Sequence, residues 1–179
     1  MRFIGLDPST KTGFVALDES GQVLRAKELT GLGSKDPKRM ITLIDEVISH
    51  IQKDDFIVIE GFGFASQQAI QLGGIGWGIR MALTRRGFKY IEASPSQVKK
   101  FCTGKGNSAK DAMIIPMYKH WGFEHPSDNV RDAYVMAQIA KSLYLDQIGD
   151  LEILHKYQEE VIQAILNPPV KAKKKKVKK

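Results

Sequence analysis

Two short apolar runs that each end in an acidic residue constrain the fold of this chain more than any other feature. FIGL at residues 3–6 ends in Asp7, and FIVI at residues 56–59 ends in Glu60. Nearly continuous apolar runs of this length are typical of central strands covered on both faces. In open α/β sheets, sites form at the carboxyl ends of strands. If these two strands are neighbours, Asp7 and Glu60 face each other at one edge of the sheet.

The other patterns predict an α/β domain with a mixed five-stranded sheet flanked by helices. Further strands are expected at 12–17, 22–29 and 89–92. Short turns join the first three strands into an antiparallel meander, and helices join the later strands as parallel crossovers. From cap residues and periodicity, helices are expected from Asp36-Pro37 to about 53, over about 66–86, after Ser94-Pro95, after Ser108 with Asp111 completing a cap, from Asp128, and over about 150–166.

The formal net charge of +7 comes from the end of the chain. Residues 167–179 contain seven lysines and no acid, and the remaining residues have equal numbers of basic and acidic side chains. A segment so charged and so poor in apolar residues is not expected to fold. We therefore predict a folded domain over 1–166 and a disordered polybasic tail over 167–179. The tail modestly favours a nucleic-acid partner; solubility, localisation or an acidic-lipid contact are the alternatives.

Composition also bears on the compartment. The single cysteine, Cys102, cannot form an internal disulfide, which fits a reducing cytosol. No run of about 18 apolar residues is present, so no membrane-spanning helix is expected. The N-terminal MRFIGLD is too short and too acidic for a signal peptide. A cytoplasmic protein without a membrane partner is expected.

Two aspartates at the start of a late predicted helix join the strand-end acids. Asp128 and Asp132 lie one helical turn apart, and Asn129 shares a face with Asp132. Carboxylates gathered in one place repel one another unless a hard cation such as Mg²⁺ neutralises them. The four histidines are scattered, so zinc is not expected. We therefore predict that Asp7, Glu60, Asp128 and Asp132 are catalytic metal ligands for phosphodiester cleavage.

Each of these acids alone has a structural alternative. Asp7 would then be a turn residue before Pro8, and Asp128 an N-cap. Glu60 is harder to explain without a partner, because it ends a fully apolar strand. The combination of acids, in this order along the chain, is much more specific than any one of them.

Lysines around a glycine-rich loop form a candidate phosphate-binding segment. No acid lies between residues 93 and 110, and a flexible loop lets ammonium and backbone N–H groups approach phosphate. The alternative is an ordinary solvated face. The candidate DNA-binding lysines are Lys99, Lys100, Lys105 and Lys110.

The helix predicted over 66–86 carries two further features. Its arginines, Arg80, Arg85 and Arg86, either follow a DNA arm or lie on a solvated surface. Its glycine-rich stretch 73–78, with Trp77 and Ile79, is either a dimer seam or a site of close packing within one subunit.

Four stretches in order resemble motifs of the RuvC family of Holliday junction resolvases, which have the ribonuclease H-like fold. They are FIGLDPSTKTGFVALD, IVIEGFGF, SPSQVKKFCTGKGNSAK and DNVRDAYVMAQIA. The resemblance implies a homodimeric nuclease that nicks two opposed strands of a four-way DNA junction with Mg²⁺ or Mn²⁺. It also implies that Asp7, Glu60 and Asp132 are metal ligands and that Lys99 and Lys110 lie near the scissile phosphate or the DNA backbone.

The chain departs from the family pattern in two places. The bacterial enzymes usually space the last two acids three apart, but position 129 is Asn; we expect Asp128, rather than Asn129, to be the fourth ligand. The aromatic that often follows the Glu by three positions is replaced by a glycine between Phe62 and Phe64. These rings are expected either to stack on a junction base or to lie in the core. The DNVRD variant and the lysine tail resemble the bacteriophage branch, with function in a bacterial cell or phage-infected host.

Three other functions fit part of the pattern. DPSTKTG at residues 7–13 resembles the first phosphate loop of actin-like phosphotransferases, but a second phosphate hairpin and a second domain do not follow. A non-catalytic nucleic-acid-binding protein of the same fold has no need of all four acids. A nuclease of this fold acting on other branched or flapped DNA, or on RNA, fits as well as a four-way junction resolvase.

Overall fold

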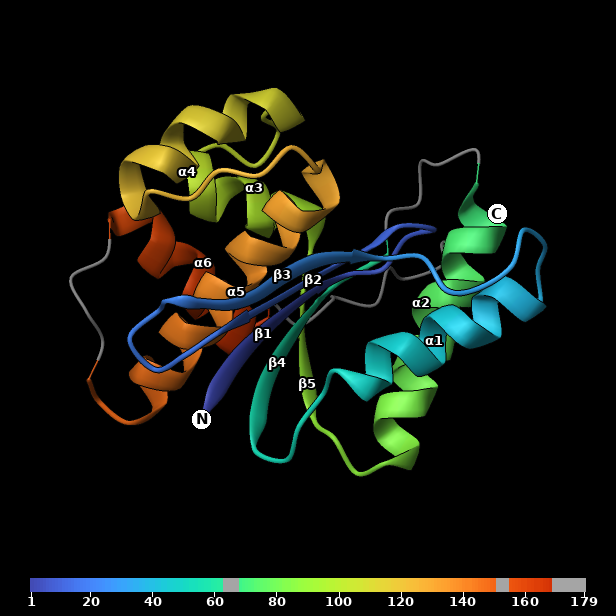
Figure 1. Ribbon diagram of the computed structural model, residues 1–179. Coiled ribbons are helices and arrows are strands. Elements are labelled where there is room, and N and C mark those ends of the chain that lie inside the picture. The colour runs from blue at the N-terminus through green and yellow to red at the C-terminus, as the bar shows by residue number, and fades with distance from the viewer. Residues whose placement is uncertain (63–67, 151–154, 169–179) are drawn as a thin grey trace, which may run out of the picture.

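The computed structural model describes residues 1–62, 68–150 and 155–168, and these ranges form a mixed sheet with helices on both faces (Figure 1). The strands are β1 (Arg2–Asp7), β2 (Thr12–Leu17), β3 (Val23–Leu29), β4 (Asp55–Glu60) and β5 (Tyr90–Ala93). The helices are α1 (Lys38–Ser49), α2 (Ala69–Arg85), α3 (Pro95–Thr103), the 3-10 turn η1 (Lys110–Met113), α4 (Ile114–Trp121), α5 (Asp128–Gln147) and α6 (Lys156–Leu166). The predicted α/β class and five-stranded mixed sheet are confirmed. None of the described helices is both long and apolar enough to cross a membrane.

The strand order β3-β2-β1-β4-β5 places the two acid-ended strands side by side. β1 pairs antiparallel with β2 and parallel with β4, and Leu6 lies opposite Ile59. Asp7 and Glu60 are the next residues on each strand, so they leave the sheet at the same edge. The predicted site depends on this pairing of β1 with β4.

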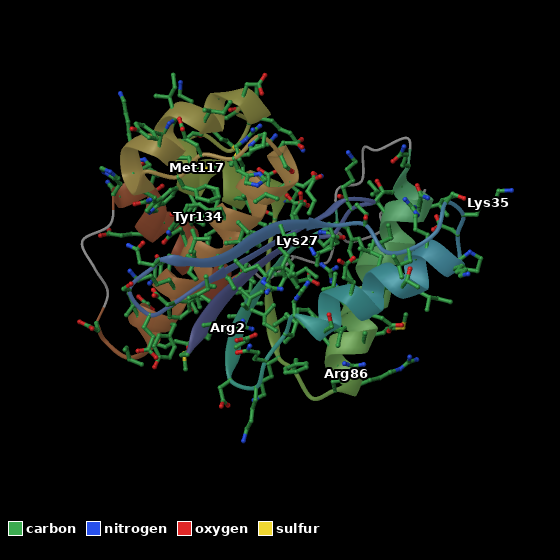
Figure 2. The ribbon with its side chains drawn as sticks, in the orientation of Figure 1. Arg2, Lys27, Lys35, Arg86, Met117 and Tyr134 are labelled. Carbon is green, nitrogen blue, oxygen red and sulfur yellow. The ribbon has the colours of Figure 1, made fainter. Side chains whose placement is uncertain are left out.

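Helix α5 lies directly on the backbone of β1 and β2. A Cβ on Gly5 would be 1.8 Å from the Ala133 carbonyl oxygen, and one on Gly13 would be 2.0 Å from that of Asn129. Only glycine permits an approach this close at either position. α5 is buried almost continuously from Val130 to Leu143, because α3, α4 and α6 cover its other side (Figure 1). Met117 of α4 and Tyr134 of α5 lie in this layer (Figure 2).

Helices α1 and α2 cover the opposite face of the sheet. They pack closely, since a Cβ on Gly78 would meet the Ile44 side chain at 2.3 Å. The glycine-rich stretch therefore serves close packing within the chain. Ile79 is buried, so it is not part of an outward seam with Trp77, which is exposed. Exposed apolar side chains on this pair of helices are Ile41, Ile70, Trp77 and Met81.

Two predicted helix starts are wrong. Asp36 does not cap α1; its carboxylate accepts hydrogen bonds from Arg39 at 3.1 Å and Gln71 at 2.5 Å. Ser108 does not cap a helix either, because its hydroxyl donates to the Lys105 carbonyl at 2.8 Å and η1 begins two residues later. The capping box predicted at Ser94 is present.

Candidate active site

The acidic side chains predicted from three distant stretches converge on one cavity. Asp7 from β1, Glu60 from β4 and Asp132 from the second turn of α5 line a cavity of about 890 Å³. Asp7 is only 5% exposed, and its carboxyl is hydrogen-bonded to that of Glu60. Thr12 fixes the turn after Asp7, because its hydroxyl donates to the Ser9 carbonyl at 2.7 Å. The three acids therefore lie at one cavity, and their role as metal ligands stays a prediction.

Burial and mutual repulsion change the ionisation of the three acids. Burial raises the pKa of Asp7 well above its usual range, and the charges of Glu60 and Asp132 raise it further. Burial also raises the pKa of Glu60 to about 7, although its hydrogen bond with Asp7 and the nearby Lys110 act in the opposite direction. Burial raises the pKa of Asp132 as well, against the effect of Lys110. Burial and mutual repulsion thus favour the protonated forms of these acids, and a cation that compensated their charge would favour the ionised forms.

Two lysines provide positive charge at this cluster. The Lys110 ammonium lies 2.6 Å from an oxygen of Asp128 and 3.7 Å from one of Asp132. Burial lowers the pKa of Lys110, but these two carboxylates raise it overall. Lys99 also lines the cavity, and its charge lowers the pKa of Glu60. Both lysines line the cavity with the three acids, and their predicted contact with DNA stays a prediction.

The side chains of Asp128 and Asn129 have different surroundings, and only that of Asn129 lines the cavity. Ser127 is the N-cap of α5, and its hydroxyl accepts from the Val130 N–H. Asn129 lines the cavity with Asp132, whereas Asp128 is outside the lining formed by the described residues and pairs with Lys110. The hydrogen bond and charge of Lys110 lower the pKa of Asp128.

Glu28 of β3 binds Asn129, which lines the cavity, and the sequence patterns did not reveal this contact. Its carboxylate accepts hydrogen bonds from the Ser127 hydroxyl at 2.5 Å and from the Asn129 side-chain nitrogen at 3.3 Å. It lies opposite Gly13, which itself lies opposite Asp7, so the three positions form one row across the sheet. The sequence indicates only that Glu28 lies next to the end of an edge strand. Many surface acids lie in such a place, so this position alone does not identify a site residue.

The donor set fits a hard divalent cation. The three lining acids and the Asn129 amide offer oxygen atoms, which Mg²⁺ prefers. Among the described residues, no three His, Cys, Asp or Glu side chains are already close enough to hold one ion together. Lys110, whose ammonium lies 3.7 Å from an oxygen of Asp132, partly neutralises the charge of this acid.

An aromatic wall forms the other part of the cavity. The rings of Phe62 and Trp77 lie 5.3 Å apart, and both side chains line the cavity together with Leu72. Phe62 is therefore at the site rather than in the core. Phe64 lies outside the described residues.

Of the remaining predicted basic residues, only Arg80 lines the cavity. Lys100 pairs with Glu160 of α6 at 2.7 Å, and Lys105 is exposed on the loop after α3. Arg85 and Arg86 are exposed at the end of α2. Arg80 is 1% exposed, so both predictions for it, a contact with a DNA arm and a solvated surface, are wrong.

Comparisons with known proteins identify the family of the chain. The family model "Crossover junction endodeoxyribonuclease RuvC" matches residues 3–121. The crossover junction endodeoxyribonuclease RuvC of Synechococcus sp. (strain WH7803) is 25% identical over 150 residues, which are 76% of this chain and 96% of the relative. The protein of the same name from Salinibacter ruber is 30% identical over 119 residues, 62% of this chain and 66% of the relative.

Solved structures show the same fold. The structure of Thermus thermophilus RuvC has a TM-score of 0.64 at 20% identity, covering 84% of this chain and 98% of that one. T. thermophilus RuvC in complex with a Holliday junction substrate has a TM-score of 0.61 at 19% identity, covering 84% and 97%. The bacteriophage branch is not addressed by these relatives and stays a prediction. Because the family model matches well over half of its residues, the chain belongs to the RuvC family of crossover junction endodeoxyribonucleases, with the ribonuclease H-like fold that the resemblance implied.

Proposed function

We propose that this protein resolves four-way or other branched DNA junctions by paired phosphodiester cuts at the cavity lined by Asp7, Glu60 and Asp132. The observation that supports this most is the convergence of three carboxylates from β1, β4 and α5 beside Lys99 and Lys110. The relative that was solved with a Holliday junction substrate has the same fold. The class of substrate follows from family membership, and the choice among branched DNAs is part of the proposal.

A divalent cation held by the three acids would polarise the scissile phosphate and lower the pKa of an attacking water. Mg²⁺ is the proposed ion, with Mn²⁺ as a substitute, because every available ligand is an oxygen. Within the chain itself, Lys110 shields Asp132 in the absence of substrate. On DNA binding its ammonium can exchange a carboxylate for a phosphate oxygen, and Lys99 lies across the same cavity.

The fourth ligand is proposed to come from position 128 or 129. The sequence favours Asp128 by charge, and the placement of Asn129 in the cavity favours its amide oxygen, since Glu28 holds the amide nitrogen. Asp128→Asn and Asn129→Ala separate the two. The variant that raises the Mg²⁺ concentration for half-maximal cleavage identifies the ligand, and an unchanged value for both removes this position from the site.

The deciding experiment uses a synthetic four-way junction, a flap and a linear duplex, each with and without Mg²⁺. Wild-type protein is expected to cut branched DNA only with the metal. Asp7→Asn should abolish cutting while junction binding persists, because it removes one ligand charge but little volume. Asp45→Asn, at an exposed position of α1, is the matched control. Binding without cleavage by the wild type would favour the non-catalytic alternative.

The lysines of residues 167–179 are proposed to add affinity for DNA without sequence preference, as a tail following a domain over 1–166. Truncation after Asn167 should weaken junction binding and flatten its salt dependence. The slope of log affinity against log salt should become shallower by about 0.9 for each phosphate that the tail neutralises in the full-length protein. Cleavage at saturating protein should be unchanged. An unaltered slope would show that the tail does not bind DNA.

A further inference from the structure

Arg80 is a buried cation that links α2 to the edge of the active site. One of its terminal nitrogens donates to the Glu60 carbonyl at 2.8 Å, and the other donates to the Gly76 carbonyl at 3.1 Å. Its Nε donates to the Glu92 carboxylate at 2.6 Å. One side chain thus joins α2 to the ends of β4 and β5.

The same guanidinium lies over the Phe62 ring, 4.3 Å from its centroid. Gly76 creates the space for this contact, because a Cβ there would lie 2.7 Å from the ring and 3.3 Å from the Arg80 nitrogen. A cation over an aromatic face is favourable, more so when both are shielded from water. Phe62 is therefore held against the cavity by a cation behind it.

Stability alone does not account for this arrangement. Burying a charge costs free energy, and a well-packed apolar side chain of similar volume is often at least as stabilising. Among the residues that the structure describes, the acidic partner of Arg80 is Glu92, whose side chain is 47% exposed. The planar guanidinium fork can satisfy two carbonyls and a carboxylate at once and still stack on a ring, which a lysine ammonium cannot do.

We propose that Arg80 is a positioning residue for the active site. It fixes the main chain of Glu60 where the strand ends, and it holds the Phe62 ring two residues later. Through these two contacts, the position of α2 sets the position of one ligand carboxylate and of the aromatic wall. The inference rests on the proposed function, because Glu60 matters in this way only if it binds the catalytic metal.

The test compares Arg80→Met and Arg80→Lys with the wild type, and uses Arg86→Met as the matched control at the exposed end of α2 (Figure 2). Mn²⁺ affinity is measured directly by calorimetry without DNA, and kcat and KM are measured on a four-way junction. Arg80→Met should lower Mn²⁺ affinity and kcat each by about 10-fold or more, as loss of a residue that supports a ligand does, and leave KM within about 3-fold. Arg80→Lys should recover only part of the loss, because it retains the charge without the fork. Arg86→Met should match the wild type.

If Arg80→Met does not fold by circular dichroism, Gly76→Ala decides the question. Its methyl group displaces the Phe62 ring and crowds the guanidinium, while alanine favours the helix. It should shift Mn²⁺ affinity and kcat in the same direction by a smaller factor. A folded Arg80→Met or Gly76→Ala with wild-type Mn²⁺ affinity and kcat overturns the inference.

The two proposals fail in different ways. If wild-type protein binds Mn²⁺ no better than Asp7→Asn and does not cut the junction, the proposed function and the role of Arg80 both fail. If wild type binds Mn²⁺ through Asp7 and cuts, but the Arg80 variants match it, only the role of Arg80 fails.

Discussion

The two faces of the sheet are covered in different ways. On one face, α5 touches the backbone of β1 and β2 through Gly5 and Gly13, and α3, α4 and α6 cover it in turn. On the other face, α1 and α2 form a single layer whose outer side exposes Ile70, Trp77 and Met81. Buried on all sides, α5 can be apolar around its circumference, whereas α1 and α2 have to meet solvent or a partner.

This difference separates two roles. The closely packed face brings Asp132 to the strand-end acids, so it determines how well Asp132, a proposed metal ligand, is placed. The open face presents an apolar surface on α2 that a second copy of the chain would cover. We propose a homodimer through this surface, because two-fold symmetry presents two active sites to two strands of a junction.

The largest expected effect comes from the same substitution made on each face. Gly5→Ala should lower the free energy of unfolding by about 3 kcal/mol or more, because its methyl group meets the backbone of α5 at 1.8 Å. Gly73→Ala, in α2, has no heavy atom within 4 Å of the new Cβ and should raise stability by about 0.5–1 kcal/mol. Urea denaturation measures both. Equal changes in the free energy of unfolding would show that the two faces tolerate an added methyl group equally well.

The second prediction tests the open face. Met81→Glu places a charge on the exposed side of α2 and should weaken the proposed dimer by about 2 kcal/mol or more, roughly 30-fold in Kd. Tyr118→Glu on α4 is the control, since Tyr118 is 56% exposed and Met81 is 49% exposed. Sedimentation velocity over a range of concentrations measures the change. Equal behaviour of the two variants would move the interface away from α2.

The smallest effect concerns the two acids that the pairing of β1 with β4 brings together. The pKa values of Asp7 and Glu60 are raised in the folded protein, so the folded state holds more protons than the unfolded chain. Their contribution to stability is complete at low pH and is lost as pH rises toward about 7, the folded pKa of Glu60. Without divalent metal, the free energy of unfolding should fall by about 1 kcal/mol per pH unit between about pH 5 and 7. Asp7→Asn should reduce this slope in urea denaturation with chelator, and Asp45→Asn should not; the same slope in both would mean that the acid pair does not titrate in this way.

The sequence contains enough to predict the sheet and the convergence of Asp7, Glu60 and Asp132. Apolar runs, turn lengths and helical spacing are local signals, and parallel pairing of β1 with β4 then places the two strand-end acids together. The expected positions of Lys99 and Lys110 came from the family resemblance instead.

What could not be predicted depends on contacts between distant segments. Whether Lys99 or Lys100 faces the cavity depends on where α6 docks, since Glu160 binds Lys100. Arg80 is buried only because Gly76, on the same helix, leaves room for its guanidinium. Glu28 contacts Ser127 and Asn129 only when the N-terminal end of α5 reaches β3.

The pairing of Leu6 with Ile59 also restricts how this chain can change in length. Side chains alternate between the two sides of a strand, so one residue inserted within β4 would turn Glu60 to the other side of the sheet and leave Asp7 without its neighbour. An insertion in the turn over residues 51–54, before the paired residues begin, would leave the pairing unchanged. Homologues that keep the activity should therefore vary in length in such turns and keep a constant count of residues along β1 and β4.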